Sequence, residues 1–459
     1  MRYASTEDTI AAISTPRGEG GIGIVRLSGT SSLQIASKMF ISSRGRNILK
    51  DTRRVFHGHV SDASGQRIDE VLLHIMRAPH SYTAEDVAEI NAHGGMAPLQ
   101  AILEEALRLG ARLAQPGEFT QRAFINGRLD LTRAEAVMDL IGAKTRTALN
   151  AANAAAGGVL ARALAGLRET LADALARIEA AVDFPEDDLP ELVDAALIHR
   201  LERAQEEMKR LIASADAGLR IREGVAVAIV GRPNVGKSSL FNTLLRDTRA
   251  IVSPEPGTTR DRIEETVALG GIPVRLMDTA GMRDTPHSVE FMGVTLARRA
   301  AQQADYILFV VDASEPSTEA DTALAAELTR LETPIVLVRN KIDLAETRFT
   351  PPDAPFKALC DISALTGAGL ERFEEQLTEL LQGDAVMETN SPMLSRTHQK
   401  DSMRRAAACL DRLLANTAAS PELSALELRD ALQALGEITG ETTPEHLLDR
   451  IFASFCIGK

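Results

Sequence analysis

The sequence contains no tryptophan, and aromatic residues make up only 3% of its 459 positions. Its hydrophobic cores must therefore be built mainly from aliphatic side chains. Cysteine is equally scarce: Cys360, Cys409 and Cys456 are odd in number and lack metal-ligand spacing, which favours reduced thiols in a cytosol. No apolar run approaches the roughly 18 residues that span a bilayer, and no charged-then-apolar leader opens the chain. We expect a cytoplasmic protein without a membrane segment.

Positive charge is also in short supply. Lys and Arg number 51 against 64 Asp and Glu, which gives a formal net charge of −13. A field of this sign repels polyphosphate backbones at long range, which excludes a non-specific nucleic-acid binder. It does not exclude RNA, because a local basic patch or a basic partner can hold a structured RNA. The sequence does not locate such a patch.

The length allows about three domains, and the first part of the chain has a mixed texture. Residues 9–113 combine short strand-like runs (IGIVRLSG, EVLLHIM, VAEINAHGG) with one stretch of helical spacing, PLQAILEEALRLGARL at 98–113. Gly and Pro punctuate the rest. We expect an α+β domain over 1–120.

Two Ala- and Leu-rich segments, 121–217 and 384–459, have helical periodicity. In the first, the helical stretch 132–182 is broken by DFPEDDLPE before another helix begins at ALIHRLERAQEE. The two segments are either two separate helical domains or one discontinuous domain, interrupted by an insertion whose ends lie close together. We favour the discontinuous domain, chiefly because of the family resemblance given below.

Between these segments, 218–383 alternates strand-like runs with helix-compatible stretches. The strand-like runs are VAVAIVG, PVRLMDTAG, YILFVVDAS, PIVLVRNKID and FKALCDISA. This alternation predicts an α/β domain with a parallel sheet, helices on its faces and chemistry at the carboxyl ends of the strands.

The first of these strands runs directly into GRPNVGKSS at 231–239, which is followed by the helix-like LFNTLLR. This is the G-x-x-x-x-G-K-S phosphate loop in its strand–loop–helix setting. Its glycines let the backbone approach phosphate, and its amides form an anion nest at a helix start. Lys237 is expected to reach the β- and γ-phosphates, and the Ser238 hydroxyl to bind Mg²⁺.

Two further motifs follow in the order that such a domain needs. PGTTRD at 256–261 lies where switch I is expected, and Thr259 is the predicted ligand of Mg²⁺ and the γ-phosphate. DTAG follows the strand VRLM, so that Asp278 reaches Mg²⁺ through water and the Gly281 amide contacts the γ-phosphate.

The base is selected by NKID at 340–343, after the strand IVLVR. The Asp343 carboxylate can accept from both guanine N1–H and the 2-amino group, and adenine offers neither donor. Leaving such a buried polar group unpaired is worth on the order of 10⁴-fold in discrimination. Ser363 and Ala364 fit a backbone contact to guanine O6. Four ordered motifs predict a P-loop GTPase domain.

The catalytic apparatus lacks one familiar part. Met282 follows DTAG, where Ras-like GTPases carry a glutamine that orients the attacking water. A thioether cannot polarise water, so a substitute is expected in the acidic stretch 284–290. No arginine finger is evident, and Arg260 and Arg283 stay open as alternatives.

The strings GRPNVGKSSL, GTTRD and DTAGMR, the N-terminal GIGIVRLSG, EDVAEINAHGG and QPGEFTQRAFINGRLDLTRAEAVMDLI, and the terminal FCIGK together resemble the MnmE (TrmE) family of tRNA modification GTPases. The likeness covers nearly the whole chain. It implies four segments: an N-terminal domain (1–120), a first helical part (121–217), a G domain (218–383) and a second helical part (384–459).

The resemblance implies that G domains dimerise across their nucleotide faces and that a K⁺ ion takes the place of an arginine finger. The matching K⁺ ligands are Asn234 and, through switch I, Ser253, Glu255 and Thr258. The water-orienting carboxylate falls on Glu290. Two prolines in SPEPG restrict the geometry of the switch I loop. The GTP site then comprises Asn234, Val235, Gly236, Lys237, Ser238, Ser239, Ser253, Pro254, Glu255, Pro256, Gly257, Thr258, Thr259, Asp278, Thr279, Ala280, Gly281, Asn340, Lys341, Asp343, Ser363 and Ala364.

The resemblance also implies a 5-formyl- or 5,10-methylene-tetrahydrofolate site in the N-terminal domain, at the interface of a homodimer. The matching positions are Arg26, Glu89, Arg128 and Lys459. From their residue types alone, the first three are paired or solvated surface charges. The string at 93–95, His-Gly-Gly, is either a turn with close backbone approach or a plain structural turn.

Cys456 lies in the terminal FCIGK string. Its plainest interpretation is a small buried packing residue. The functional alternative is a thiolate that adds to C6 of uracil near the folate. The sequence shows no base or cation beside it that would activate the thiol.

The activity that the resemblance implies is addition of a carboxymethylaminomethyl or aminomethyl group to C5 of the wobble uridine of certain tRNAs. The flavoprotein MnmG (GidA) brings FAD, the folate supplies the methylene, and GTP hydrolysis drives conformational change. A GTP-dependent ribosome-assembly switch of the Era or Der type is the main alternative. A folate-dependent one-carbon transferase, regulated by its GTPase, is a third.

Overall fold

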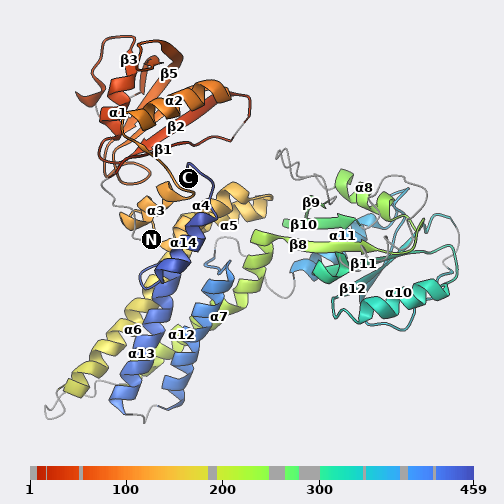
Figure 1. The fold of residues 1–459 in the computed structure, drawn as a ribbon. Coiled ribbons are helices and arrows are strands. Elements are labelled where there is room, and N and C mark those ends of the chain that lie inside the picture. Colours follow the sequence, from red (N-terminus) through yellow and green to blue (C-terminus); the bar gives the residue numbers. More distant parts are fainter. Residues whose placement is uncertain are drawn as a thin grey trace. The chain divides into compact units, whose positions relative to one another are not determined.

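The computed structural model describes residues 8–16, 18–50, 55–183, 194–247, 264–278, 300–344, 348–382, 391–416 and 420–459. The chain forms two compact units and contributes separate segments to each (Figure 1). The first unit takes 1–138, 156–192 and 418–459, and the second takes 139–155 and 193–417. No helix within the described ranges is both long and apolar enough to cross a bilayer.

A seven-stranded sheet forms the N-terminal part of the first unit, in the order β3-β4-β5-β6-β2-β1-β7. Helices α1 and α2 share one core with these strands, in which Val25, Leu73 and Ile90 are fully buried. This is the α+β domain that the sequence predicts. The elements are β1 (Ile10–Ile13), β2 (Gly20–Ser28), α1 (Ser32–Met39), β3 (Phe40–Ser42), η1 (Ile48–Lys50), β4 (Val55–Ser61), β5 (Arg67–Met76), β6 (Val87–Gly94), α2 (Met96–Arg108) and β7 (Arg112–Leu113).

Helix α2 is shorter than its apolar spacing predicts, because it ends at Arg108 instead of continuing to residue 113. Gly110 then takes a φ of 109°, in the region that favours glycine. The chain turns there, and Arg112 and Leu113 pair in parallel with β1. The helical prediction for 109–113 is therefore wrong, since a glycine stop and a strand partner outweigh the apolar pattern.

The long helices before the nucleotide-binding segment pair with helices after it. Helix α6 packs along α13 in the first unit, and α7 packs along α12 in the second. The discontinuous helical arrangement is thus confirmed, and the alternative of two separate helical domains is wrong. The helices are α3 (Glu118–Ile125), α4 (Leu131–Gly142), α5 (Arg146–Ala156), α6 (Val159–Asp183), α7 (Ala195–Glu223), α12 (Thr397–Ala415), α13 (Pro421–Thr439) and α14 (Glu445–Ala453).

The Ala-rich stretch at 132–182 is three helices rather than one. A break at 143–145 separates α4 from α5, and a second break at 157–158 separates α5 from α6. At the second break Gly158 has a φ of 78°, which a residue with a Cβ rarely adopts. Helical periodicity alone did not reveal these breaks, because Ala- and Leu-rich helical spacing resumes directly after each of them.

A network of largely buried charges fastens α3 to the N-terminal sheet. Arg122 is only 3% exposed, and its guanidinium donates to Asp8, Glu85 and Glu118. Arg112 Nη2 lies 2.5 Å from Glu118 Oε1, and its Nε lies 2.8 Å from Asp8 Oδ2. Burial would raise the pKa of Asp8 and of Glu118, but the hydrogen bonds from the arginines outweigh it and hold both pKa values below their usual range. The arginines therefore keep the carboxyl groups of Asp8 and Glu118 ionised.

The second unit contains a six-stranded sheet in the order β13-β12-β11-β8-β10-β9. Five of its strands are parallel, as the sequence predicts, but β9 runs antiparallel to β10 as an edge strand. A hydrophobic core lies on each face. The elements are β8 (Val225–Val230), α8 (Lys237–Asp247), β9 (Glu264–Leu269), β10 (Ile272–Asp278), β11 (Tyr306–Asp312), α10 (Glu319–Thr329), β12 (Ile335–Asn340), β13 (Phe356–Asp361) and α11 (Leu370–Gln382).

The two-residue turn between β9 and β10 is held from two sides. Gly270, with a φ of 56°, lies so close to α11 that an added Cβ would be 2.1 Å from Thr378 Cγ2. Gly271, with a φ of 82°, lies as close to α5, where an added Cβ would be 2.2 Å from Thr147 Oγ1. Both glycines are required here, because any side chain would force the hairpin away from a helix.

Candidate functional site

The loop between β8 and α8 has the geometry of a phosphate-binding loop. It joins a fully buried strand to a helix that begins at Lys237. Asn234 and Gly236 have φ angles of 65° and 96°, and such left-handed residues within a loop form the backbone of an anion nest. Lys237 Nζ donates to the Arg232 carbonyl oxygen at 2.7 Å. The loop thus holds its lysine within the turn that would enclose phosphates.

The positions that the sequence predicts to bind Mg²⁺ lie at the same end of the sheet, at the start of α8 and the end of β10. Ser238 and Ser239 are exposed in the first turn of α8. Asp278 ends β10 and pairs with Ile229 of β8, two residues before the loop. The described residues contain no group of three His, Cys, Asp or Glu that would hold a metal alone. A Mg²⁺ ion shared with a nucleotide needs only one or two protein oxygens, and the exposed Ser238 hydroxyl fits this role.

Asn340 joins the phosphate loop to the base-recognition loop. It is 2% exposed, and its Nδ2 donates to the Val235 carbonyl oxygen at 2.9 Å. Its Oδ1 accepts from the Ala364 amide, also at 2.9 Å. An added Cβ on Gly236 would lie 2.1 Å from Asn340 Nδ2, so only glycine permits this approach. The side-chain amide of Asn340 therefore holds Val235 and Ala364, which are far apart in the sequence, on either side of it.

Replacing Asn340 by alanine is expected to weaken GTP binding at least tenfold and to destabilise the second unit by about 2 kcal/mol, because two buried backbone groups lose their partner. Titration calorimetry and denaturant unfolding measure the two effects. Asn416, at the exposed end of α12, provides a matched control for the same substitution. Unchanged GTP affinity in Asn340→Ala would contradict the bridging role.

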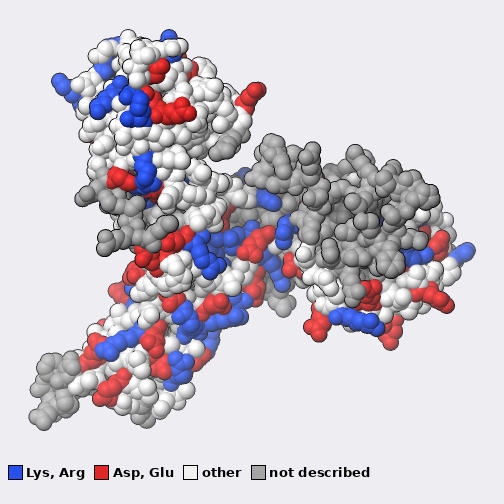
Figure 2. Space-filling model, in the orientation of Figure 1, with Lys and Arg blue, Asp and Glu red and all other residues white. Residues whose placement is uncertain are grey.

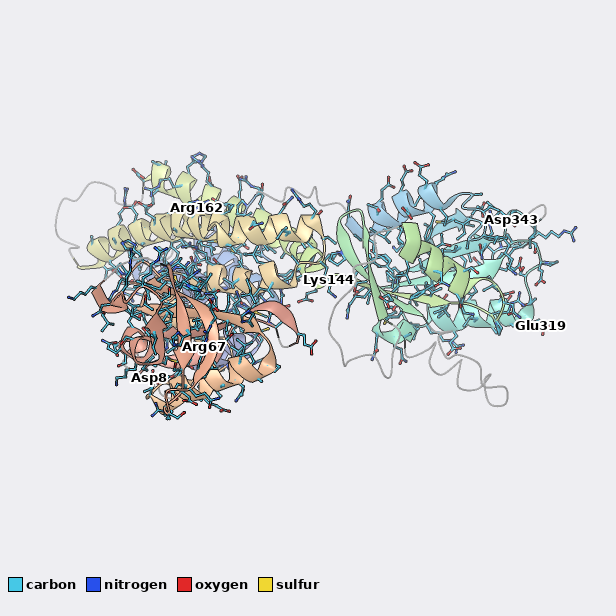
Figure 3. The ribbon with its side chains drawn as sticks, turned by 90° about the horizontal axis from the view of Figure 1, so that it is seen from above. Asp8, Arg67, Lys144, Arg162, Glu319 and Asp343 are labelled. Carbon is cyan, nitrogen blue, oxygen red and sulfur yellow. The ribbon has the colours of Figure 1, made fainter. Side chains whose placement is uncertain are left out.

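The other residues of the NKID string lie around the same edge. Lys341 has a φ of 69°, and its Nζ lies 2.6 Å from Asp312 Oδ2. Burial would raise the pKa of Asp312, but hydrogen bonds from Lys341 and Ser314 hold it below its usual value. The Asp343 side chain is exposed and lies at the end of this sheet opposite Lys144 (Figure 3). Its carboxylate is therefore accessible to a base.

Ser363 and Ala364 follow β13 and are buried. The Ser363 hydroxyl accepts from the Thr366 amide at 3.1 Å, and the Ala364 carbonyl oxygen accepts from Thr243 Oγ1 of α8 at 3.0 Å. Together with the Asn340 contact, these bonds fix the loop that is predicted to meet guanine O6.

One residue of the phosphate loop has a role that its motif does not reveal. Arg232 Nε lies 2.7 Å from Asp321 Oδ1, and Asp321 is fully buried at the start of α10. Asp321 also closes a capping box with Thr318. The loop is thus anchored to α10 by a partner 89 positions away in the sequence, which no local pattern identifies.

Several predicted residues lie outside the described ranges. They are Ser253, Pro254, Glu255, Pro256, Gly257, Thr258, Thr259, Arg260, Thr279, Ala280, Gly281, Met282, Arg283 and Glu290. The side chain of Asp278 is also outside the description. The predicted switch I, switch II, K⁺ shell and water-orienting carboxylate therefore stay predictions.

A second candidate site lies in the N-terminal sheet. Arg26 of β2 and Glu89 of β6 are cross-strand partners, with Arg26 Nε 2.8 Å from Glu89 Oε1. Their side chains are 13% and 17% exposed. Arg26 Nη1 donates to the Gly458 carbonyl oxygen at 3.0 Å, so the C-terminal tail reaches the same pair. The structure brings together residues from both ends of the chain.

Two aromatic rings complete this site, and the sequence prediction missed both. The Arg26 guanidinium lies 5.4 Å from the Tyr82 ring centre and 5.5 Å from that of Phe119. Arg128 lies 5.0 Å from the same Tyr82 ring and donates to the Tyr82 carbonyl oxygen at 2.9 Å. Tyr82 therefore links Arg128 to the Arg26–Glu89 pair. The chain has only three tyrosines, but nothing in the sequence placed this one.

The C-terminal tail is held against the first strand. Gly458 has a φ of 91°, and an added Cβ would lie 2.7 Å from the Ile13 carbonyl oxygen. Burial and the nearby Arg26 lower the pKa of Lys459, while Glu89 opposes the change. Cys456 is exposed, so its interpretation as a buried packing residue is wrong. The pattern misled because the buried partner in this string is Phe455.

The string at 93–95 is not a turn. His93 and Gly94 end β6, and Gly95 is the N-cap of α2. Close backbone approach does occur, since an added Cβ on Gly94 would lie 2.5 Å from the Gly20 carbonyl oxygen. His93 Nδ1 lies 2.8 Å from Asp69 Oδ1. The string serves strand pairing.

The pairing of Arg26, Glu89 and Tyr82 suits a folate head group. The Glu89 carboxylate can accept from an aminopyrimidine edge, and its Oε2 has no partner among the described residues. An arginine beside it can meet a pterin carbonyl. The residues present therefore fit the group that the resemblance implies.

Two family models match the parts of the chain that contain the two candidate sites. The family model described as "MnmE helical domain" matches residues 131–456, and that described as "GTP-binding protein TrmE N-terminus" matches residues 9–128. The chain is 46% identical over 457 residues to the tRNA modification GTPase MnmE of Geobacter sulfurreducens, with 99% of each chain covered. It is 42% identical over 464 residues to that of Alkaliphilus oremlandii, with the same coverage.

Among solved structures, one match is Aquifex aeolicus Era Y63A bound to GDP and AlF₄⁻. It is 28% identical, and the match covers 40% of this chain and 66% of that one, with a TM-score of 0.27. The sequence relatives and family models carry the assignment.

Proposed function

The chain belongs to the family of the tRNA modification GTPase MnmE, and we propose that it uses GTP hydrolysis to modify the wobble uridine of certain tRNAs. As a member of this family it is a GTPase. The geometry that supports the proposal best is the Asn340 bridge, which ties the loop for phosphates to the loop for the base.

The described residues would act as follows in hydrolysis. Lys237, with Ser238 beside it at the start of α8, neutralises the β- and γ-phosphates. Asp343 selects guanine by accepting from two donors. Mg²⁺, held by the Ser238 and Thr259 hydroxyls, would neutralise charge that develops on the phosphates. Glu290 is proposed to orient the attacking water in place of Met282.

We propose that K⁺ supplies the further positive charge. Asn234 has the left-handed geometry that exposes it at the rim of the phosphate loop. Ser253, Glu255 and Thr258 would complete the shell.

GTP turnover is therefore expected to be on the order of 10²-fold slower in Na⁺ than in K⁺ at equal ionic strength, because the proposed mechanism needs a bound K⁺ to stabilise the charge of the transition state. Phosphate release assays measure it. Asn234→Ala should lower turnover in K⁺ to the Na⁺ level without changing GTP affinity as strongly. Equal rates in the two salts for the unaltered chain would remove the K⁺ mechanism.

We further propose that Arg26, Glu89, Arg128 and Lys459 bind a tetrahydrofolate that carries one carbon at the formyl or methylene level. Cys456, exposed and three residues from the terminus, would then lie near the reacting uracil. Arg26 orients Glu89 through their 2.8 Å contact.

Glu89→Gln is expected to weaken binding of 5-formyltetrahydrofolate by about tenfold to 100-fold, because an amide accepts more weakly than a carboxylate. Equilibrium dialysis with the labelled folate measures the loss. Glu70→Gln on the neighbouring strand β5 is a control, because Glu70 is exposed and paired with Arg67. Equal folate affinity in the unaltered chain and Glu89→Gln would refute the assignment.

We also propose that the chain forms a homodimer, works with the flavoprotein MnmG (GidA) as the source of FAD, and takes tRNA as its substrate. We place the protein in the cytoplasm, where these substrates occur. The proposed domain limits are 1–120, 121–217, 218–383 and 384–459. Assay of wobble-uridine products with and without the flavoprotein tests the whole scheme: product is expected only with both proteins, GTP and folate.

A further inference from the structure

Two arginines flank the break between α5 and α6. The position of a Cβ on Gly158 lies 3.4 Å from Arg162 Nη1 and 3.8 Å from Arg133 Nε, so both guanidinium groups lie close to this residue. Figure 3 labels Arg162 on α6. Two like charges are thus held close together at a fixed point of the first unit.

Neither arginine is paired with a carboxylate among the described residues. Arg133 Nε donates to the Ala156 carbonyl oxygen at 3.1 Å, and its Nη1 to that of Arg128 at 3.4 Å. Arg162 Nη1 donates to the Gly157 carbonyl oxygen at 2.8 Å. Since each guanidinium has five N–H donors, most of them are left for another acceptor.

Two other arginines of the same unit are paired with carboxylates. Arg177 lies 3.3 Å from Asp173, and Arg429 lies 2.6 Å from Glu179. Figure 2 likewise shows Lys and Arg interspersed with Asp and Glu along the long helices of the face in view. In a chain of net charge −13, two adjacent arginines without carboxylate partners in the described part of the chain leave a local positive charge.

The plainest role for these contacts is to cap the last carbonyls of α5, where cations are favoured. That role uses one N–H of each arginine, on the Ala156 and Gly157 carbonyl oxygens, and leaves other donors of both guanidinium groups. Two arginines held together repel each other, and an anion between them removes that repulsion.

We propose that Arg133 and Arg162 bind consecutive phosphates of the tRNA backbone. This inference rests on the proposed function and supplies the local basic patch that a net acidic RNA-modifying protein requires. Arginine suits the role because its planar fork pairs with phosphate oxygens in two places.

The position of the pair favours RNA. Arg133 contacts the Arg128 carbonyl oxygen, and Arg128 lies over Tyr82, whose ring also faces Arg26. A backbone held at Arg133 and Arg162 is therefore next to the candidate folate site. A tRNA must bring its uridine to that site, so its phosphates have to be held close by.

The test uses the full chain with its flavoprotein partner and a labelled tRNA transcript that carries an unmodified wobble uridine. Arg133→Gln/Arg162→Gln is expected to bind this tRNA about 10- to 100-fold more weakly. The slope of log affinity against log salt should become shallower by about 1.4 to 1.8, as two phosphate contacts are lost. GTP turnover and the unfolding transition should stay unchanged.

Arg177→Gln/Arg429→Gln is the matched control, since it removes the same charge from arginines that already have carboxylate partners. Equal weakening in both double variants, or tRNA affinity and salt slope unchanged in the first, would overturn this assignment while leaving the proposed function intact. Loss of affinity for an oligoglutamyl folate in place of tRNA would assign the pair to the folate tail and would also overturn it. No binding of tRNA by the unaltered complex would refute the proposed function together with this inference.

Discussion

Asp343→Asn is expected to lower the affinity for GTP by on the order of 10³-fold and to raise the affinity for xanthosine triphosphate. The carboxylate of Asp343 is exposed at the end of the sheet, beside a loop that Asn340 and Lys341 hold in place. It can accept from N1–H and the 2-amino group of guanine. An amide accepts once and donates once, which matches the carbonyl that xanthine carries at C2.

Titration calorimetry in the presence of Mg²⁺ measures the affinities of both variants for guanosine, xanthosine and adenosine nucleotides. Asp353→Asn is the control, because Asp353 is exposed in the same domain and undergoes the same chemical change. Affinity for ATP should stay negligible throughout. If Asp343→Asn bound GTP as the unaltered chain does, base recognition would have to lie elsewhere.

Arg122→Met is expected to destabilise the first unit by about 3–5 kcal/mol, because it leaves three carboxylates in a largely buried site without their common cation. Denaturant unfolding of the full chain, followed by a probe in this unit, measures the change. Arg67→Met is the control: Arg67 is 54% exposed and its partner Glu70 is 52% exposed, so little change is expected there. Comparable unfolding of the two variants would contradict the role of the network.

The same network sets a dependence on pH. Asp8 and Glu118 have pKa values below their usual range, so their contribution is present above about pH 4 and is lost as the pH falls through the lowered values. In Arg122→Met this acid-sensitive part should shrink. If acid lowered the stability of the unaltered chain and of Arg122→Met equally, other carboxylates would dominate the dependence of stability on pH.

Local sequence patterns identified the residues of the nucleotide site, but they did not identify the long-range contacts that hold these residues together. The strand before GRPNVGKS and the strands before DTAG and NKID are where the sequence predicts them, because buried parallel strands and glycine loops have strong local patterns. The contacts that unite them are long-range. Asn340 is part of a recognised motif, yet its bridge from Val235 to Ala364 depends on tertiary packing.

The N-terminal site shows the same limit more strongly. Arg26, Glu89, Arg128 and Lys459 came from the resemblance, and their charges alone indicated only surface residues. The strand register explains why Arg26 and Glu89 pair. The two residues are 63 positions apart in the sequence but stand opposite one another on adjacent strands. The Tyr82 ring that joins them to Arg128 has no sequence signal. Strand β9 was missed for a related reason: a glycine pair made a tight hairpin where alternation suggested only parallel strands.

The glycine hairpin has a mechanical consequence for the proposed GTPase cycle. Strands β9 and β10 begin after the predicted switch I and end at the start of the predicted switch II, but their shared turn is wedged between Thr147 and Thr378. A ribbon fixed at one tip can pivot about it but cannot slide lengthwise. In the proposed cycle, changes at the γ-phosphate would act on the end of the hairpin that is farthest from its turn, and that turn lies against Thr147 of α5.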